Sequence, residues 1–352
     1  MKVQSNVKYN MEQRGPFPRL VLKSRFVKAL EDKAACYPVY RKLQFAARVE
    51  LEVVLDAIAL DPAWRAHRLD YWATVLDGDG VYTWISGNRN RDYCSCLVEI
   101  WASDVVRAEE VRNRILEKVG ATRITEPMFA IEWCFLSGNG SIETANVEEI
   151  ADGHPLDVAY PTIEGGVGAF IERYLDAPES VLVLQGPPGT GKTRLIRAIL
   201  GEISRRKGGE QAEVLYTGDT KALQSDGVYV KFITGLNDAF VVEDADHLLK
   251  PRADGNDHLH RFLAIADGVV RAQGRKIIFS TNLPNVGDLD EALLRPGRCF
   301  ALVNARALNE KEARTLMEKV AGGDAVKLEG GKPLFERKAK SYTMAEVYRA
   351  LR

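Results

Sequence analysis

The sequence contains no long apolar run. No stretch approaches the roughly 18 to 20 residues that a membrane-spanning helix needs, and the amino terminus lacks the apolar middle segment of a secretion signal. Cysteine is scarce, and no two cysteines have the spacing of a zinc site. The five are Cys36, Cys94, Cys96, Cys134 and Cys299. These absences argue against a membrane span and a disulfide framework, so we expect reduced thiols and a cytoplasmic location.

Net charge is also close to zero, with 48 Lys and Arg against 49 Asp and Glu. This balance gives no global argument for binding nucleic acid or an anionic membrane. The distribution is uneven, because residues 1–50 hold eleven basic side chains and four acidic ones. Either a solvated arm or a docking patch for an acidic partner would account for this excess. Pro16 and Pro18 among mixed polar residues predict a flexible basic arm over residues 1–20.

The first half of the chain has the pattern of a mixed α+β domain. Its periodicity predicts a helix over residues 43–60, a hairpin formed by 71–76 and 81–86, a strand over 94–101, a helix over 109–119 and a strand over 129–136. We expect an α+β domain over residues 21–150 that selects a substrate or partner. The polar, glycine-containing residues 138–153 are the expected linker. All five tryptophans lie in this half, either in an aromatic-rich core or on a docking face.

The second half contains a strand, a glycine loop and a helix in the order of a phosphate-binding loop. An apolar strand over residues 181–184 leads into Gly186, Pro187, Pro188, Gly189, Thr190, Gly191, Lys192 and Thr193. The glycines allow successive N–H groups to point at phosphate oxygens, and the following helix adds its positive dipole end. Lys192 should reach the β- and γ-phosphates, and Thr193 should ligate Mg²⁺. The segment therefore predicts a site for ATP with Mg²⁺.

A second apolar strand, residues 239–242, ends in Glu243 and Asp244. Carboxylates at the carboxyl end of a parallel strand beside a phosphate loop belong at the metal and the attacking water. The usual order is Asp then Glu, and here it is inverted. Matching by position gives Glu243 the Mg²⁺ role and Asp244 the activation of water. A shift by one residue would make Asp244 the metal carboxylate and put Ala245 where the base belongs, leaving a weak or inactive ATPase.

Two further polar groups follow. A strand over residues 276–280 leads to Asn282, which can hydrogen-bond the γ-phosphate, orient the water or merely cap the strand. Arg295 and Arg298 lie on a short turn that contains a proline and a glycine. Their guanidinium groups are always charged and can bind phosphate bidentately, although the pair would also suit a surface salt bridge.

Taken in order, these segments resemble the AAA branch of the AAA+ ATPases, over roughly residues 158–298 and a short helical lid. The resemblance implies an α/β fold, with the parallel sheet of a P-loop NTPase sandwiched between helices as the AAA core. It implies a large ATPase domain over residues 151–303 and a small helical lid over residues 304–352. The amino-terminal α+β domain would precede them.

The resemblance also implies roles for the motifs. Residues 186–193 would be Walker A, Glu243 and Asp244 Walker B, and Asn282 sensor 1. Arg295 and Arg298 look like arginine fingers, which in this family enter the ATP site of the neighbouring subunit. The chain would therefore associate with itself as a ring, a hexamer or heptamer.

The details are most similar to the ATPase domain of the mitochondrial AAA translocases that export the folded Rieske protein, and to their bacterial relatives. The inverted Glu-Asp order, a segment like residues 262–268 and a lid segment like residues 342–347 carry this similarity. The chain departs from that family in its first 150 residues and in having no membrane anchor, so Rieske export is not inferred. Tyr229 is a candidate substrate-gripping residue of a central pore, or part of the core.

The leading hypothesis is an ATP-hydrolysing remodelling ATPase of the unfoldase, translocase or disassembly-chaperone type. Its substrate would be an unidentified macromolecule, a protein rather than a nucleic acid, chosen by the amino-terminal domain. A nucleic-acid-stimulated loader or motor, using the basic arm and the tryptophan-rich domain, is the first alternative. A nucleotide-switched scaffold with low turnover is the second, and it would follow from the shifted Walker B alignment.

Overall fold

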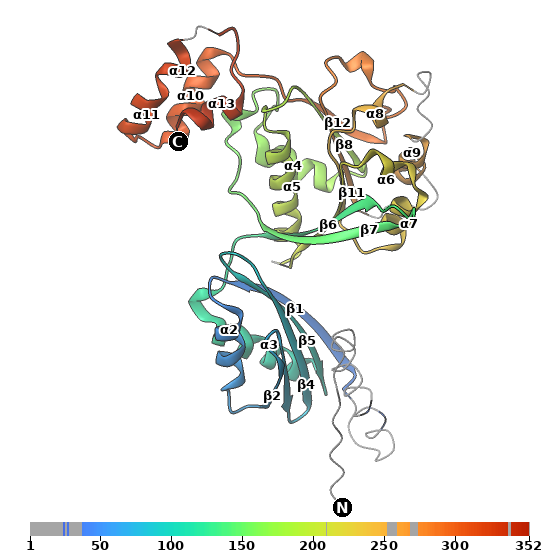
Figure 1. The fold of residues 1–352 in the computed structure, drawn as a ribbon, viewed down its shortest axis with the longest axis vertical. Helices are drawn as coiled ribbons and strands as arrows, with labels where there is room; N and C mark the ends of the chain where they lie inside the picture. Colours follow the sequence, from blue (N-terminus) through green and yellow to red (C-terminus); the bar gives the residue numbers. More distant parts are fainter. Residues whose placement is uncertain are drawn as a thin grey trace, which may run out of the picture. The chain divides into compact units, whose positions relative to one another are not determined.

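The computed structural model describes residues 37–208, 210–251, 259–267, 274–336 and 339–351, together with Ser24 and Val27. The chain divides into an amino-terminal unit that ends at Thr125 and a carboxy-terminal unit that begins at Glu126 (Figure 1). The predicted basic arm over residues 1–20 lies outside the described residues. Within the described ranges, no helix is long and apolar enough to span a bilayer.

Over residues 37–125 the amino-terminal unit is an antiparallel sheet of five strands, in the order β1-β5-β4-β3-β2, with helices α2 and α3. Its elements are β1 (Val39–Ala47), α2 (Leu51–Ala59), β2 (Arg65–Asp70), β3 (Ala73–Gly78), β4 (Val81–Arg89), β5 (Cys94–Ala102) and α3 (Val105–Val119). The side chain of Asp104 caps α3 by accepting a hydrogen bond from the Arg107 N–H. Apolar side chains of both helices and of one sheet face form a single core. The predicted α+β character of this unit is confirmed.

One predicted helix in this unit is wrong in its first part. Residues 43–47 belong to β1, and the helix begins only at Leu51. Leu43, Phe45 and Ala47 are buried on one side of β1, which is the alternation of a strand, and β1 pairs with β5 along its whole length. The helical spacing of the apolar residues holds only within α2 and does not reach back into β1. The predicted hairpin, the strand at 94–101 and the helix at 109–119 are present as β3 and β4, β5 and α3.

The carboxy-terminal unit is built on a sheet of seven strands in the order β12-β8-β11-β10-β9-β6-β7. The strands are β6 (Met128–Leu136), β7 (Ile142–Ile150), β8 (Val181–Gln185), β9 (Ala212–Thr217), β10 (Ala239–Val242), β11 (Lys276–Thr281) and β12 (Cys299–Asn304). All neighbouring strands pair in parallel except β7, which is antiparallel to β6. Parallel strands need helical crossovers, so helices cover both faces.

The helices of this unit form two layers and a lid. They are α4 (Val167–Asp176), α5 (Lys192–Arg206), α6 (Thr220–Gln224), α7 (Asp226–Thr234), α8 (Asp246–Leu249), α9 (Leu259–Asp267), α10 (Glu310–Ala321), α11 (Ala325–Gly331), α12 (Pro333–Glu336) and α13 (Met344–Ala350). Alternate residues of β8 divide between two cores. Leu182 and Leu184 belong to the core formed with α4, α5 and the lid helices α10 to α13, whereas Val181 and Val183 belong to the core formed with α7, α8 and α9. The predicted α/β sandwich with a helical lid is confirmed.

The domain boundary predicted near residue 150 is wrong. Strand β6 lies in the carboxy-terminal sheet, where it pairs with β9 from Phe129 to Trp133. The hydroxyl of Thr217 also donates to the Cys134 carbonyl at 2.9 Å. The segment 138–153, predicted to be a linker, contains β7. It looked like a linker because β7 is an edge strand with no buried residue, and polar residues are frequent in it.

Candidate functional site

The glycine loop connects β8 to α5 with the geometry of a phosphate cradle. Gly186, Gly189 and Gly191 all have positive φ, at 154°, 80° and 89°, which side chains with a Cβ rarely adopt. A Cβ on Gly186 would also collide with the carbonyl of Ala305. Helix α5 begins at Lys192, so its amino-terminal N–H groups face the loop. The loop thus has the backbone conformation and helix dipole that favour phosphate binding.

The ammonium of Lys192 lies inside this loop. Nζ donates to the carbonyl of Gly186 at 2.6 Å, to the carbonyl of Pro187 at 3.1 Å and to Oδ1 of Asn282 at 2.9 Å. The side chain is nearly buried, with 8% exposed. Burial lowers the pKa of Lys192, and the carboxylates of nearby Asp244, Asp246 and Glu243 oppose that shift. A buried cation held by the loop is what the recognition of phosphate oxygens requires.

Glu243 lies beside the loop hydroxyl at the start of α5. The Thr193 hydroxyl donates to Oε1 of Glu243 at 2.5 Å, and the Tyr216 hydroxyl donates to Oε2 at 2.9 Å. A hydroxyl next to a carboxylate is the hard oxygen set that Mg²⁺ prefers. The residues present therefore fit the expected Mg²⁺, which Thr193 and Glu243 would hold.

Asp244 faces a different partner. Its Oδ1 accepts a hydrogen bond from Nδ2 of Asn282 at 2.9 Å, and its side chain is exposed in the cavity. Its φ of 50° makes it the one non-glycine residue with positive φ among those the structure describes. The turn after β10 therefore directs Glu243 and Asp244 to different neighbours. This geometry favours the first alignment, in which Glu243 is on the metal side.

Asn282 is held in place by Asp246, which the sequence did not single out. Oδ1 of Asp246 accepts from the Thr281 hydroxyl at 2.6 Å and from the Asn282 N–H at 2.8 Å. The amide of Asn282 then bridges Lys192 and Asp244. Sequence reasoning missed Asp246 because it begins the short helix α8, where an acidic residue is commonly only a helix-starting residue.

These groups line one cavity of about 790 Å³ in the carboxy-terminal unit. Its lining residues are Asp152, Pro188, Gly189, Gly191, Lys192, Thr193, Arg194, Arg197, Glu243, Asp244, Ser280, Asn282, Met344, Ala345 and Tyr348. The glycine loop, the carboxylates of Glu243 and Asp244, and Asn282 therefore lie around one cavity.

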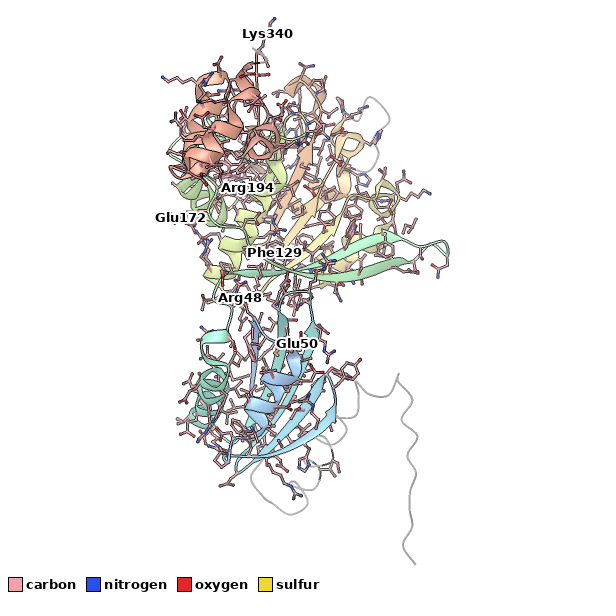
Figure 2. All side chains as sticks on the ribbon, turned by 60° about the vertical axis from the view of Figure 1, so that its left-hand side comes forward. Arg48, Glu50, Phe129, Glu172, Arg194 and Lys340 are labelled. Carbon is pink, nitrogen blue, oxygen red and sulfur yellow. The ribbon has the colours of Figure 1, made fainter. Side chains whose placement is uncertain are left out.

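The lid supplies the side of the cavity that the sequence did not predict. The N–H of Ala345, in the first turn of α13, donates to the carbonyl of Gly189 at 3.0 Å. The guanidinium of Arg194, marked in Figure 2, lies 4.6 Å from the ring centre of Tyr348. The one available signal was the capping pair that starts α13, Thr343 and Glu346.

Arg295 and Arg298 do not line this cavity in the same chain. Arg295 is exposed. Arg298 is half-buried, and its guanidinium donates to the carbonyl of Ala292. The structure of one chain therefore does not bring the two arginines to the site.

Of the two roles left open for Tyr229, the structure supports the one in the core. It lies on helix α7 with 4% of its surface exposed. Its hydroxyl donates to the carbonyl of Leu223 at 2.8 Å, and its ring centre lies 4.9 Å from that of Phe262. Val228 and Phe232 on the same helix are buried beside it, so Tyr229 belongs to the core.

The strand order and the glycine loop define a P-loop nucleotide-binding protein of the α/β class. Residues 182–306 match the family described as "ATPase family associated with various cellular activities (AAA)". This part of the chain is therefore an AAA ATPase domain. The match begins in β8 and ends beyond β12, so the hairpin of β6 and β7 lies outside it.

Several characterised proteins are similar to the chain. The ATP-dependent zinc metalloprotease YME1 homolog of Caenorhabditis elegans is 30% identical over 184 residues, covering 45% of this chain and 25% of that protein. The peroxisomal ATPase PEX6 of Homo sapiens is 27% identical over 285 residues, covering 78% and 26%. The proteasome-activating nucleotidase of Methanocaldococcus jannaschii is 30% identical over 176 residues, covering 47% and 39%. The matches span only about a quarter to two-fifths of these relatives. The finer similarity to Rieske-protein translocases stays a prediction.

Proposed function

We propose that the chain is an ATP-hydrolysing remodelling ATPase that works as a ring of identical subunits. The observation that carries the proposal is a polar network of two hydrogen-bonded groups at the carboxyl ends of β8, β10 and β11. Lys192, Asn282 and Asp244 form one group, and Thr193 and Glu243 form the other. Ligands of open α/β sheets bind at this edge. The similarity to proteins named as ATPases and a nucleotidase supports the same reaction.

Each residue of the network has a role in the proposed reaction. The loop amides and Lys192 bind the β- and γ-phosphates, and Thr193 and Glu243 hold Mg²⁺. When bound, Mg²⁺ neutralises charge on the phosphate oxygens. The oxygen of the attacking water bonds to the γ-phosphorus while the bond from that phosphorus to the leaving ADP oxygen breaks. Asp244 accepts the proton that this water loses. Asn282 orients that water through its contact with Asp244.

Arg295 and Arg298 would complete the site of the neighbouring subunit. Their position outside the cavity of their own chain is compatible with such a role, and Arg295 is exposed at the surface. A guanidinium from a neighbour can neutralise charge that develops on the transferred phosphoryl group. This proposal makes hydrolysis depend on self-association into a hexamer or heptamer.

The substrate would be a protein, selected by the amino-terminal unit. The near-zero net charge supports a protein substrate over a nucleic acid. Trp64 and Trp84 are buried, which leaves less aromatic surface for stacking on bases. A cytoplasmic location belongs to the same proposal, supported by the free thiols of Cys94, Cys96, Cys134 and Cys299.

The test is ATP hydrolysis measured across protein concentrations. Specific activity should rise as subunits associate, and Lys192→Ala or Asp244→Asn should abolish it. Mixing Arg295→Ala subunits with Lys192→Ala subunits should restore part of the activity, because some interfaces then pair an intact Lys192 with an intact Arg295. Full activity in a dilute monomer would refute the shared site. Stimulation by DNA or RNA that weakens with salt would instead favour the nucleic-acid alternative.

A further inference from the structure

Tyr216 links the metal-side carboxylate to the added hairpin of β6 and β7. It lies on β9, opposite Trp133 of β6 in the parallel ladder. The two ring centres are 5.3 Å apart with the planes at 85°, the edge-to-face geometry that aromatic pairs favour. Trp133 covers the Tyr216 ring while 47% of its own surface stays exposed.

The hydroxyl of Tyr216 has one polar contact at the site. It donates to Oε2 of Glu243 at 2.9 Å, while Thr193 donates to Oε1. The phenol therefore contacts one carboxylate oxygen of Glu243 and the threonine hydroxyl contacts the other. Tyr216 is absent from the cavity lining, so it acts on the site from behind Glu243.

The inverted Glu-Asp order gives a reason for this support. A glutamate has one more rotatable bond than the aspartate usual at this position, and fixing that bond costs conformational entropy. Two hydrogen bonds, one to each carboxylate oxygen, would hold Glu243 in a single orientation before metal binding. Partners of this kind behind a metal ligand commonly contribute to metal affinity.

We propose that Tyr216 is a positioning residue that fixes Glu243 for Mg²⁺ binding, with the edge contact of Trp133 holding the tyrosine ring in place. The inference rests on the proposed function because it takes Glu243 as a metal ligand. It adds that the hairpin outside the matched AAA region contributes to the metal site.

The first test compares Tyr216→Phe with the wild-type protein. The phenylalanine keeps the ring contact with Trp133 and removes the hydroxyl. Calorimetric titration with a non-hydrolysable ATP analogue should give the same affinity for both proteins in EDTA. Mg²⁺ should strengthen binding of the analogue, and the Mg²⁺ concentration that gives half of this effect should be about ten-fold higher for Tyr216→Phe. Tyr229→Phe is the matched control, since its hydroxyl bonds to a main-chain carbonyl away from the site, and it should leave the titration unchanged.

The second test uses Trp133 as a reporter. The other tryptophans, Trp64, Trp72, Trp84 and Trp101, lie in the amino-terminal unit. The tryptophan fluorescence that is lost in Trp133→Phe should therefore come from Trp133 on β6. In the nucleotide-loaded protein, Mg²⁺ should change this emission, and Tyr216→Phe should reduce the change at subsaturating Mg²⁺.

The two proposals fail in different ways. A Tyr216→Phe variant with the Mg²⁺ titration of the wild type would overturn the role of Tyr216 and leave the ATPase proposal standing. A wild-type protein that binds Mg²⁺ and nucleotide without hydrolysis would overturn the ATPase proposal, while a shifted titration in Tyr216→Phe would still support the positioning role. A wild-type protein that binds no Mg²⁺ with nucleotide would overturn both.

Discussion

Asn282 donates a hydrogen bond from Nδ2 to Oδ1 of Asp244 at 2.9 Å. Its own Oδ1 accepts from Nζ of Lys192, also at 2.9 Å. Only a side chain with both a donor and an acceptor can bridge a carboxylate and an ammonium in this way. The amide therefore joins the residue proposed to activate water to the residue proposed to bind phosphate.

Replacing Asn282 with aspartate should separate turnover from binding. The variant keeps the acceptor for Lys192 but loses the donor to Asp244 and adds a carboxylate that repels it. We expect kcat to fall by about 100-fold, with ATP affinity changed by only a few-fold. Steady-state kinetics and calorimetric binding would measure the two effects. Asn139→Asp, on the exposed turn between β6 and β7, is the control. Unchanged kcat in Asn282→Asp would contradict this role.

Glu243→Gln and Asp244→Asn should differ in kind. Because Glu243 pairs with Thr193, its substitution should raise the Mg²⁺ concentration required for nucleotide binding. Asp244→Asn should leave that requirement near the wild-type value and lower turnover by more than about 100-fold. Titrating Mg²⁺ in binding and hydrolysis assays would distinguish them. A raised Mg²⁺ requirement in Asp244→Asn, with an unchanged requirement in Glu243→Gln, would support the alignment shifted by one residue.

The hairpin of β6 and β7 should be needed for folding of the carboxy-terminal unit. Phe129 is fully buried, and β6 covers the edge of β9. A fragment starting at residue 126 should melt cooperatively, whereas one starting at residue 151 should lose several kcal/mol of unfolding free energy (~2 kcal/mol for each large apolar side chain lost) and aggregate through the exposed edge. Thermal melts and size-exclusion chromatography would compare them. Equal melting temperatures would show that the hairpin is dispensable.

Lys276 should make stability depend on alkaline pH. Its Nζ donates to the carbonyls of Ala177 at 2.8 Å and Glu179 at 3.1 Å, and the residue is 2% exposed. Burial lowers the pKa of Lys276 from 10.5 to about 8. Between these two values the unfolded chain binds more protons than the folded one, so the unfolding free energy should increase with pH.

The measurement is the unfolding free energy of the wild type minus that of Lys276→Met. This difference should rise by on the order of 1–3 kcal/mol between about pH 8 and about pH 10.5. Other groups that titrate in this range contribute equally to both proteins and cancel in the subtraction. Denaturant unfolding at several pH values would supply it. A flat difference across this window would mean that Lys276 titrates at its ordinary pKa.

The phosphate loop could be predicted from the sequence because its constraints are local. The spacing of Gly186, Gly189 and Gly191 fixes the backbone, and the adjoining strand and helix are each visible in a few residues. Glu243 and Asp244 could be placed nearby because the carboxyl ends of parallel strands meet at one edge. Their separate partners, Thr193 and Asn282, could not be assigned, since they depend on the left-handed turn at Asp244.

Other features depend on contacts between distant segments. Trp133 and Tyr216 lie far apart in the sequence and meet only through the register of β6 and β9. Strand β7 is an edge strand in which no side chain is fully buried, so its mixed composition resembles that of a loop. The apolar residues around Tyr229 alternate over a window so short that the pattern fits either a strand or a buried helix. In the structure this segment is helix α7, whose apolar side chains pack in the core.

The hydrogen bond from Ala345 in the lid to Gly189 in the glycine loop has a consequence for the timing of the cycle. If the lid swings outward, it must break this bond, and the loop backbone then loses one of its restraints. Release of ADP and outward movement of the lid would therefore occur together and share one energy barrier. When product release is the slowest step, a substitution in α13 changes the rate of ATP turnover without altering any contact to the phosphates.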